Sequence, residues 1–514
     1  MSETIKLISP VDGSVYAERP VASAAEIDKA VAEARSAQAA WAATPLSERC
    51  DAVLAAVAAL EAMNDEIVPE LAWQMGRPVR YGGEKGGTRE RADYMVKIAE
   101  EALAPRHHTD RPGFTRYVKP EPLGVVLIIA PWNYPFMTAI NTIVPALIAG
   151  NTVILKHAAQ TLLVGERLAK AFEIAGVPKG VFRNIVLNHG QTEQLLASGR
   201  IDHINFTGSV GGGRAIEKAA AGTFASLGLE LGGKDPSYVR EDADVAFAIE
   251  GMGDGAFFNA GQCCCGVERV YVHEKHYDQV VEGLVAFASN YKLGNPLDEA
   301  TTLGPMANRR FAAVVRRQIE EAIAAGATPL VDPKLFPQDD GGAYLAPQVL
   351  VNVDHSMDVM REESFGPVVG IMKVSSDEEV ATGAGGDSLD GAVADAVDEE
   401  ASLGYVPDEE LDESESSQDH EDLVLSCPGR NVVEEIDGGH VLKESEPAYV
   451  QALAEAREEG GSEDRQSGST HEERDDAEGE EVIVHRSVPE TDGSAAEALS
   501  LEFGAIPSRL GTGR

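Results

Sequence analysis

Residues 124–135 read GVVLIIAPWNYP, and this stretch holds the clearest strand signal in the chain. Its apolar run, Val125–Ala130, lacks polar alternation, which is typical of a strand buried on both faces of a parallel sheet. Further short runs rich in Val and Ile follow, and segments with helical periodicity separate them as far as Ala221. This alternation predicts the α/β class, with a doubly wound parallel sheet covered by helices on both sides.

The predicted elements form two α/β regions that follow a group of helices. Ser23 and Glu26 form a capping-box pair that begins a long amphipathic helix, and two further helices are predicted near 52–60 and 90–102. The first region comprises strands Val125–Ala130, Thr152–Leu155, Val181–Val186 and Ile204–Phe206, with helices near Ala139–Ala149, Leu163–Ala175, Thr192–Ser198 and Arg214–Ala221. The second comprises helices near Ala243–Phe258 and Ala307–Ala324, with strands near Arg269–Val272 and Pro367–Val374.

A run of three cysteines, Cys263–Cys265, follows a Gly-Gln pair and is the strongest candidate for chemistry. Metal sites normally use spaced cysteine pairs, so three adjacent thiols argue against zinc, and no metal site is predicted. A thiolate nucleophile and an inert buried cysteine both fit the run taken alone. In a doubly wound sheet, ligands bind beyond the carboxyl ends of the strands, which points to the segments beginning at Pro131, Lys156, Thr207 and Glu230.

The chain has 514 residues, of which 43% are hydrophobic, and this is enough for two or three domains. Its net charge of −42 disfavours binding to nucleic acid or to anionic lipid. No apolar run is long enough to span a bilayer, and the N-terminus lacks a signal-peptide pattern. The isolated Cys50 and Cys427 fit no disulfide framework. We therefore expect a cytoplasmic protein that binds neither nucleic acid nor a membrane.

Six motifs occur together in the chain, in one order and at characteristic spacings. They are Pro131-Trp132-Asn133, Lys156, Phe206-Thr207-Gly208-Ser209, Leu229-Glu230-Leu231-Gly232-Gly233-Lys234, Gly261-Gln262-Cys263-Cys264 and Glu363-Ser364-Phe365-Gly366-Pro367. As a set they resemble the motifs of the aldehyde dehydrogenase superfamily. The resemblance covers about residues 5–379.

The resemblance implies a domain organisation and a set of partners. Residues 1–103 and 122–232 would form the dinucleotide-binding domain, 104–121 the bridging or oligomerisation strands, and 233–379 the catalytic domain. The expected partners are a small-molecule aldehyde substrate and further copies of the chain, as a homodimer or a homotetramer.

Three catalytic residues follow from the resemblance. Cys264 matches the family's nucleophile and would form a thiohemiacetal and then a thioester with the substrate. Glu230 resembles the general base, and we expect partial burial to raise the pKa of its carboxylate. The side-chain amide of Asn133 and the backbone N–H of Cys264 would face the developing oxyanion. Cys263 and Cys265 are expected to be small packing residues.

The resemblance also implies a nicotinamide cofactor, NAD or NADP. The Gly-x-Gly-x-x-Gly fingerprint is absent, and the family instead uses the strand-to-helix turn at Thr207 to Gly213, where a helix N-terminus favours a pyrophosphate. Many NAD-preferring members carry a Glu where this chain has Ala159, and its absence removes an anion that would repel the 2′-phosphate of NADP. The residues assigned to cofactor binding are Trp132, Lys156, Thr207, Gly208, Ser209, Gly213, Leu231, Glu363 and Phe365.

The composition changes abruptly near residue 380. Residues 377–514 contain 39 acidic and 8 basic side chains, whereas the first 376 residues contain 46 and 35. The family's C-terminal motifs do not occur in this segment, which reads as an acidic, disordered tail. Two explanations stay open, an out-of-frame or replaced tail and a genuine acidic tail. The missing part would close the substrate tunnel and supply the oligomer strand, so we expect impaired activity.

The sequence therefore predicts an NAD(P)-dependent dehydrogenase that oxidises an aldehyde or semialdehyde to the carboxylic acid. A CoA-acylating relative is the alternative among enzymes, although such relatives usually lack the Glu found at position 230. From another class, the chain could be a catalytically impaired binding or scaffold protein that acts through its acidic tail.

Overall fold

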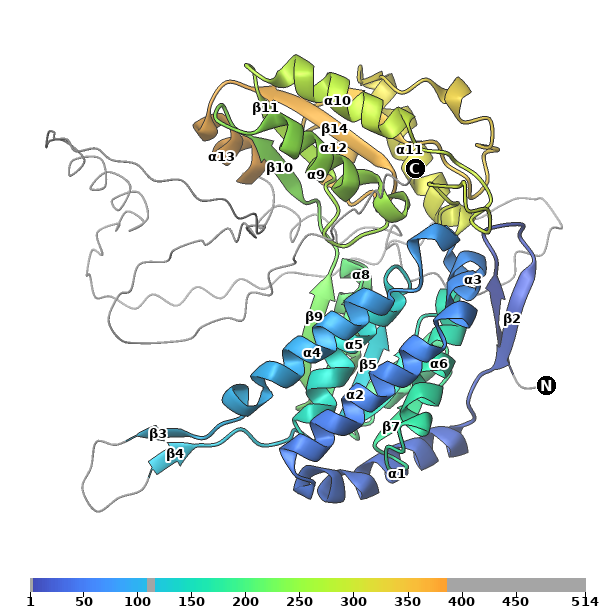
Figure 1. Cartoon of the computed structure of the whole chain (residues 1–514), viewed down its shortest axis with the longest axis vertical. Coiled ribbons are helices and arrows are strands. Elements are labelled where there is room, and N and C mark those ends of the chain that lie inside the picture. Colours follow the sequence, from blue (N-terminus) through green and yellow to red (C-terminus); the bar gives the residue numbers. More distant parts are fainter. Residues whose placement is uncertain (1–2, 109–115, 386–514) are drawn as a thin grey trace, which may run out of the picture. The chain divides into compact units, whose positions relative to one another are not determined.

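The computed structural model describes residues 3–108 and 116–385. Two five-stranded sheets with helices packed against them dominate these residues, and two short two-stranded sheets accompany them (Figure 1). The predicted α/β class, with a doubly wound sheet followed by a second α/β region, is confirmed. The predicted acidic tail from residue 386 onward lies outside the described residues.

The first sheet is entirely parallel and has the strand order β7-β6-β5-β8-β9. Its strands are β5 (Val125–Ala130), β6 (Thr152–His157), β7 (Phe182–Asn184), β8 (His203–Gly208) and β9 (Ser226–Leu231). From β5 the chain first builds outward on one side through β6 and β7, and then on the other through β8 and β9. The order therefore reverses between β5 and β8, which is where ligands bind in doubly wound sheets.

Both faces of this sheet are buried, as the unbroken apolar run of β5 predicts. The even-numbered residues from Val126 to Ala130 belong to a core shared with the helices α2 to α6. The odd-numbered residues from Val125 to Ile129 belong to another core, shared with α1, α7 and α8. Successive strand residues point to opposite faces, so one strand contributes to both cores.

Eight α-helices belong to the first region in the described part of the chain. They are α1 (Ala24–Ala43), α2 (Leu46–Ala62), α3 (Asn64–Met75), α4 (Lys85–Ala102), α5 (Pro135–Ile148), α6 (Leu162–Ile174), α7 (His189–Ala197) and α8 (Val210–Ala220). The capping box predicted at the start of α1 is present, because Ser23 and Glu26 bond each other's backbone N–H groups. The sequence prediction omits α3, which carries Pro69 in its interior.

The second sheet has the order β10-β11-β14-β13-β12, and all its neighbours are parallel except the pair β12 and β13. Its strands are β10 (Pro236–Val239), β11 (Arg269–His273), β12 (Thr328–Pro329), β13 (Gln348–Val351) and β14 (Val368–Val374). The accompanying helices are α9 (Val245–Phe257), α10 (Tyr277–Ser289), α11 (Arg309–Ala324) and α12 (Asp358–Arg361). The sequence prediction omits α10, β10, β12, β13 and α12.

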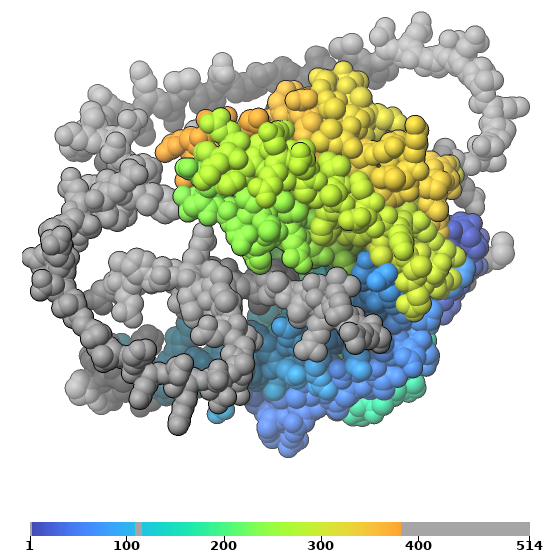
Figure 2. Space-filling model, turned by 45° about the horizontal axis from the view of Figure 1, so that its top comes forward, coloured from blue at the N-terminus to red at the C-terminus, as the bar shows by residue number. Residues whose placement is uncertain are grey.

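The segment after α3 is hydrogen-bonded to the second region. The backbone N–H of Val79 donates to the carbonyl of Pro296 at 2.8 Å, and the Tyr81 hydroxyl donates to the carbonyl of Thr302 at 3.0 Å. In the space-filling view, the blue N-terminal residues are in contact with the yellow-green residues of the second region (Figure 2). These contacts join two parts of the chain that lie more than 200 residues apart.

Three shorter features complete the fold. Strands β1 (Thr4–Ile8) and β2 (Val15–Pro20) form an antiparallel pair, and so do β3 (Arg106–His108) and β4 (Arg116–Val118), which lie in the segment predicted to carry bridging strands. Helix α13 (Asp377–Gly385) begins in the predicted catalytic domain and ends inside the predicted tail. Among the described helices, none is long and apolar enough to cross a membrane.

Candidate active site

The turn after β5 places Asn133 beside the segment that leads to Cys264. The Asn133 side chain is buried, with 3% of its surface exposed, and its Nδ2 donates a hydrogen bond to the carbonyl oxygen of Gln262 at 3.3 Å. This turn lies between the end of β5 and the start of α5 at Pro135, at the carboxyl end of the central strand. The structure thus brings the Asn133 amide to the main chain two residues before Cys264.

A tight left-handed turn precedes the cysteines. The φ angles of Asn259, Ala260 and Gly261 are 56°, 57° and 69°, in a region that residues with a side chain rarely adopt. A Cβ atom on Gly261 would lie 2.2 Å from the carbonyl oxygen of Gly366, so this position also lacks room for a side chain. The buried Gln262 holds the turn, because its amide donates to the Asn259 carbonyl at 2.9 Å and accepts from the N–H of Ala307 at 2.8 Å.

The three cysteines differ in exposure and in acidity. Cys263 and Cys264 are half-buried, whereas Cys265 is exposed, which contradicts the expectation that it packs inside. The Sγ atoms of Cys263 and Cys265 lie 3.4 Å apart. The Cys263 thiol lowers the pKa of Cys264, but the Cys265 thiol and burial outweigh it and raise that pKa to about 11. Attack by Cys264 near neutral pH therefore needs a proton acceptor.

Hydrogen bonds from Cys263 and Cys264 lower the pKa of Cys265 to about 3. No group of three or more His, Cys, Asp or Glu side chains in residues 3–108 and 116–385 is arranged to hold a metal ion.

Glu230 lies near the end of β9, where it pairs in register with Thr207 of β8. Its side chain is exposed, so the expected partial burial is not found. β9 is the edge strand of the first sheet, and no described strand pairs with its outer edge. The structure shows no hydrogen bond between Glu230 and Cys264 within its described part.

The turn from β8 into α8 gathers several of the predicted cofactor residues. Ser209 is the N-cap of α8, and its Oγ accepts a hydrogen bond from the N–H of Gly212 at 3.1 Å. Thr207 and Gly208 end the preceding strand. A Cβ atom on Gly213 would lie 2.7 Å from Leu231 Cδ2, so glycine lets α8 approach β9 closely.

Lys156 lies at the end of β6, two strands away from that turn. Its side chain is half-buried, and burial lowers its pKa to about 8. The neighbouring His157 is buried and hydrogen-bonded to the carbonyl of Pro135 at 3.2 Å. Burial lowers the pKa of His157 to about 4, so its imidazole is neutral near pH 7. Lys156 is thus a cation at the carboxyl edge of the first sheet.

Glu363 and Phe365 approach the first region from the second. A Cβ atom on Gly232 would lie 2.0 Å from Glu363 Oε1, which places the carboxylate against the glycines that follow Glu230. Burial, and the nearby charge of Glu268, raise the pKa of Glu363 to about 7. The Phe365 ring meets the Trp132 ring edge-on, with 5.5 Å between centroids.

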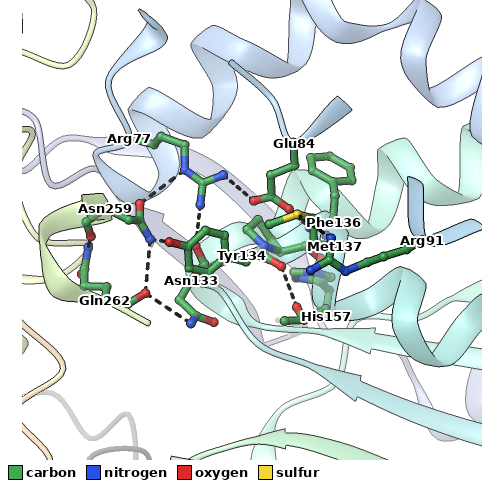
Figure 3. A network of polar contacts seen from close by, with 12 residues as sticks. Arg77, Glu84, Arg91, Asn133, Tyr134, Phe136, Met137, His157, Asn259 and Gln262 are labelled. Atoms are coloured by element: carbon green, nitrogen blue, oxygen red, sulfur yellow. Dashed lines mark hydrogen bonds and ion pairs between the residues drawn. The ribbon is translucent and has the colours of Figure 1, made fainter. Parts of the chain in front are cut away.

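Several buried polar residues around the site were not predicted. Glu268 accepts hydrogen bonds from the N–H groups of Ser364 and Phe365, each at 2.8 Å, and pairs with Lys234 at 2.7 Å. Arg77 and Glu84 form a second buried pair beside Asn133 (Figure 3). Lys234 belongs to a quoted motif, but no pattern in the sequence marks Glu268, Arg77 or Glu84.

Comparisons with known proteins identify the family. A family model described as the aldehyde dehydrogenase family matches residues 1–386. Vanillin dehydrogenase from Corynebacterium glutamicum is 34% identical, over 73% of this chain and 77% of the relative. D-glyceraldehyde dehydrogenase (NADP(+)) from Picrophilus torridus is 31% identical, over 74% of this chain and 77% of the relative.

Among solved structures, the NAD-dependent aldehyde dehydrogenase from Sinorhizobium meliloti superimposes with a TM-score of 0.70 and 35% identity, covering 74% of this chain and 76% of that one. This likeness agrees with the α/β fold with parallel sheets described above. The chain belongs to the aldehyde dehydrogenase family, whose members oxidise aldehydes to carboxylic acids.

Proposed function

We propose that this chain oxidises an aldehyde through covalent attack by Cys264, with Asn133 and Glu230 as the other catalytic residues. The observation that carries the proposal is the hydrogen bond from Asn133 Nδ2 to the Gln262 carbonyl, which joins the turn after β5 to the segment that presents Cys264. The Cys264 thiol first gives its proton to water, and attack of the resulting thiolate on the carbonyl carbon converts the carbonyl oxygen into an alkoxide. The second N–H of the Asn133 amide and the backbone N–H of Cys264 stabilise that alkoxide.

Release of a hydride from this adduct leaves a thioester on Cys264. Glu230 then takes a proton from a water molecule, and the resulting hydroxide attacks the thioester carbon. The carbon–sulfur bond breaks, so that the acid leaves and the thiolate returns. The exposure of Glu230 is compatible with this role, because its carboxylate must reach water.

The carboxyl ends of the first sheet fit a nicotinamide dinucleotide. The N-terminus of α8 and the Ser209 and Thr207 hydroxyls suit a pyrophosphate, and the Lys156 ammonium suits ribose hydroxyls. Glu363 suits the ribose next to the nicotinamide, with Trp132, Leu231 and Phe365 packing nearby. When bound, the cofactor supplies the oxidising power by accepting a hydride.

Both NAD and NADP are accepted under this proposal. The relatives include one named for NADP and a structure described as NAD-dependent. Ala159 lies three residues after Lys156, is exposed, and carries no charge. A carboxylate at this position would repel a 2′-phosphate.

Replacing Ala159 by glutamate is expected to raise KM for NADP by about tenfold or more while leaving KM for NAD within about twofold, because the new anion faces the 2′-phosphate. Initial rates with each cofactor at saturating aldehyde measure this split. Ala159→Gln, which has the same size without the charge, is the control. An equal rise in both KM values in Ala159→Glu would show that position 159 does not face the adenosine ribose.

The acidity of Glu363 predicts a pH dependence for cofactor binding. Its folded-state pKa is raised from 4.5 to about 7, so the carboxylate accepts hydrogen bonds from ribose hydroxyls above pH 7 and is protonated below it. We expect KM for the cofactor to rise by up to about tenfold per pH unit as the pH falls below 7. The raised pKa of Glu363 also affects stability, because the folded chain holds this proton more tightly than the unfolded chain does. The resulting stabilisation is fully present below pH 4.5 and is lost as the pH rises through 7.

Glu363→Gln is expected to bind the cofactor more weakly at pH 8 than the parent chain, and with no inflection near pH 7. Cofactor titrations of both chains, followed by quenching of tryptophan fluorescence, measure this. A parent profile that is flat through neutral pH would contradict the role given to Glu363.

The proposed function is tested by incubating the purified chain with NAD or NADP and a panel of aldehydes: one aromatic, one hydroxylated and one carboxylated. We expect reduced nicotinamide and carboxylic acid in equal amounts with at least one of them. Reduced nicotinamide without acid, or no turnover with any aldehyde, would contradict the proposal. We also propose that the chain forms the homodimer or homotetramer expected from its sequence, and light scattering on the same sample tests this.

A further inference from the structure

Arg77 contacts both loops that meet at the candidate active site. It follows Gly76, the C-cap residue of α3, and only 4% of its side chain is exposed. Its guanidinium donates to the carbonyl oxygen of Asn133 at 2.7 Å and to Oδ1 of Asn259 at 3.3 Å. It also lies over the Tyr134 ring, 4.9 Å from the centroid. One buried cation therefore touches the turn after β5 and the turn before the cysteines (Figure 3).

Glu84 balances the charge of Arg77 and also binds the start of α5, which follows the turn after β5. Its Oε1 pairs with the guanidinium, and 3% of its side chain is exposed. Its Oε2 accepts hydrogen bonds from the backbone N–H groups of Phe136 and Met137, at 2.9 and 2.7 Å. These are the first free amides of α5, whose own N-cap residue makes no side-chain cap. Glu84 thus caps α5 although it lies outside that helix. A negative charge is favoured there, because the N-terminus of a helix carries partial positive charge.

The backbone conformation of Glu84 also points to a specific role. Its φ angle is 63°, a conformation that is unfavourable for a residue other than glycine. The contacts of its carboxylate hold it there, because one oxygen pairs with Arg77 and the other accepts two backbone hydrogen bonds. A glycine would fit the backbone without strain but would leave the buried charge of Arg77 without its carboxylate partner and the α5 amides without their acceptor.

The two loops are further bonded to each other around Arg77. Asn259 Nδ2 donates to the carbonyls of Asn133 at 3.1 Å and Gln262 at 3.2 Å, and Asn133 Nδ2 donates to the same Gln262 carbonyl. Arg77 fixes Asn259 by its Oδ1, so the orientation of the Asn259 amide depends on the guanidinium. The position of Asn133 relative to the chain entering Cys264 therefore depends on Arg77 and Glu84.

We propose that Arg77 and Glu84 are positioning residues that set where the Asn133 amide lies relative to Cys264. Neither touches the substrate. The inference rests on the proposed function and deepens it, since it assigns the alignment of the oxyanion donor to one buried ion pair. The competing possibility is that the pair stabilises the fold and has no specific effect on turnover.

Arg77→Lys is the informative variant, because it keeps a cation beside the buried Glu84 carboxylate. A lysine ammonium lacks the planar fork of arginine and cannot reach Glu84, Asn133 and Asn259 together. We expect kcat to fall by about 10- to 100-fold, as misplacing a catalytic group by an ångström can do, with KM for the cofactor unchanged. Arg77→Ala would also leave a buried unpaired carboxylate and could fail to fold.

Arg316→Lys is a matched control. Arg316 is also partly buried, pairs with Asp339 at 2.7 Å, and donates to the carbonyls of Gly342 and Tyr344, all in the second region. Within the described residues, its hydrogen bonds and ion pair reach neither loop of the candidate site. We expect the two lysine variants to lower the thermal unfolding midpoint by similar amounts, while Arg316→Lys keeps the parent kcat. An equal loss of kcat in both variants would mean that Arg77 acts through stability.

A double-mutant cycle with Asn133→Ala tests whether Arg77 acts through Asn133. We expect Arg77→Lys to change kcat by about twofold or less in the Asn133→Ala background, since the residue it positions is gone. If the double variant instead loses kcat by the product of the two single losses, the positioning inference is overturned and the proposed function stays intact. If Asn133→Ala alone keeps the parent kcat, the oxyanion role in the proposed function is wrong, and the inference falls with it.

Discussion

Replacing Cys264 by alanine is expected to lower kcat/KM for aldehyde oxidation by about 10⁴-fold or more, because no other group can form the covalent adduct. The measurement is the initial rate of nicotinamide reduction with the best aldehyde of the panel. Cofactor binding should survive, since Cys264 is not among the residues proposed to hold the dinucleotide. A thermal shift on adding cofactor to the variant checks this and shows that the variant is folded.

Cys265→Ser is the control for this substitution. Cys265 is exposed, is adjacent to Cys264, and has no assigned role in the reaction. We expect this variant to keep most of the parent activity. Turnover that persists in Cys264→Ala, or that is lost equally in Cys265→Ser, would mean that the nucleophile has been assigned to the wrong thiol or that the reaction is not covalent.

Replacing Glu230 by glutamine is expected to lower steady-state kcat by about 10²- to 10⁴-fold, because the amide cannot take a proton from water. The step that forms the thioester does not need this proton transfer. The first turnover should therefore survive as a rapid burst of reduced nicotinamide, about one equivalent per Cys264, followed by a slow phase. Stopped-flow absorbance separates the two phases.

Glu274→Gln provides the comparison. Like Glu230, Glu274 is an exposed carboxylate near the end of a strand, but it lies in the second region. It should leave both phases unchanged. A Glu230→Gln chain that loses the burst together with the steady state would place Glu230 in the first half of the reaction. Unchanged kcat in that chain would remove it from the mechanism.

Some elements with strong local patterns were predicted correctly, whereas α10 was missed although its buried Val280, Leu284 and Ala288 recur at helical spacing. Val125–Ala130 was predicted with the bounds that the structure gives, because a short apolar run rich in Val and Ile, bounded by Gly124 and Pro131, favours a strand. The capping box of α1 was predicted for the same reason, since Ser23 and Glu26 are three residues apart. Helix α3 was missed because Pro69 interrupts its pattern. Local signals therefore determine how well each element can be predicted.

The supporting residues of the site could not be predicted in this way. Arg77 and Asn259 are 182 residues apart, and Glu268 and Phe365 are 97 apart, so only the tertiary fold brings their side chains together. For Glu230, the residue was predicted but its degree of burial was predicted wrongly. Its neighbours Leu229 and Leu231 point to the opposite face of β9, so they do not indicate whether Glu230 itself is buried, and the structure leaves it exposed.

The central claim is that Cys264 forms the bond to the substrate. The most direct test is to quench Glu230→Gln during the burst and to locate the acyl group by mass spectrometry of the peptide that contains residues 263–265. We predict one acyl group, attached to Cys264. An acyl group on Cys263 or Cys265, or a burst of reduced nicotinamide with no acylated peptide, would contradict the claim.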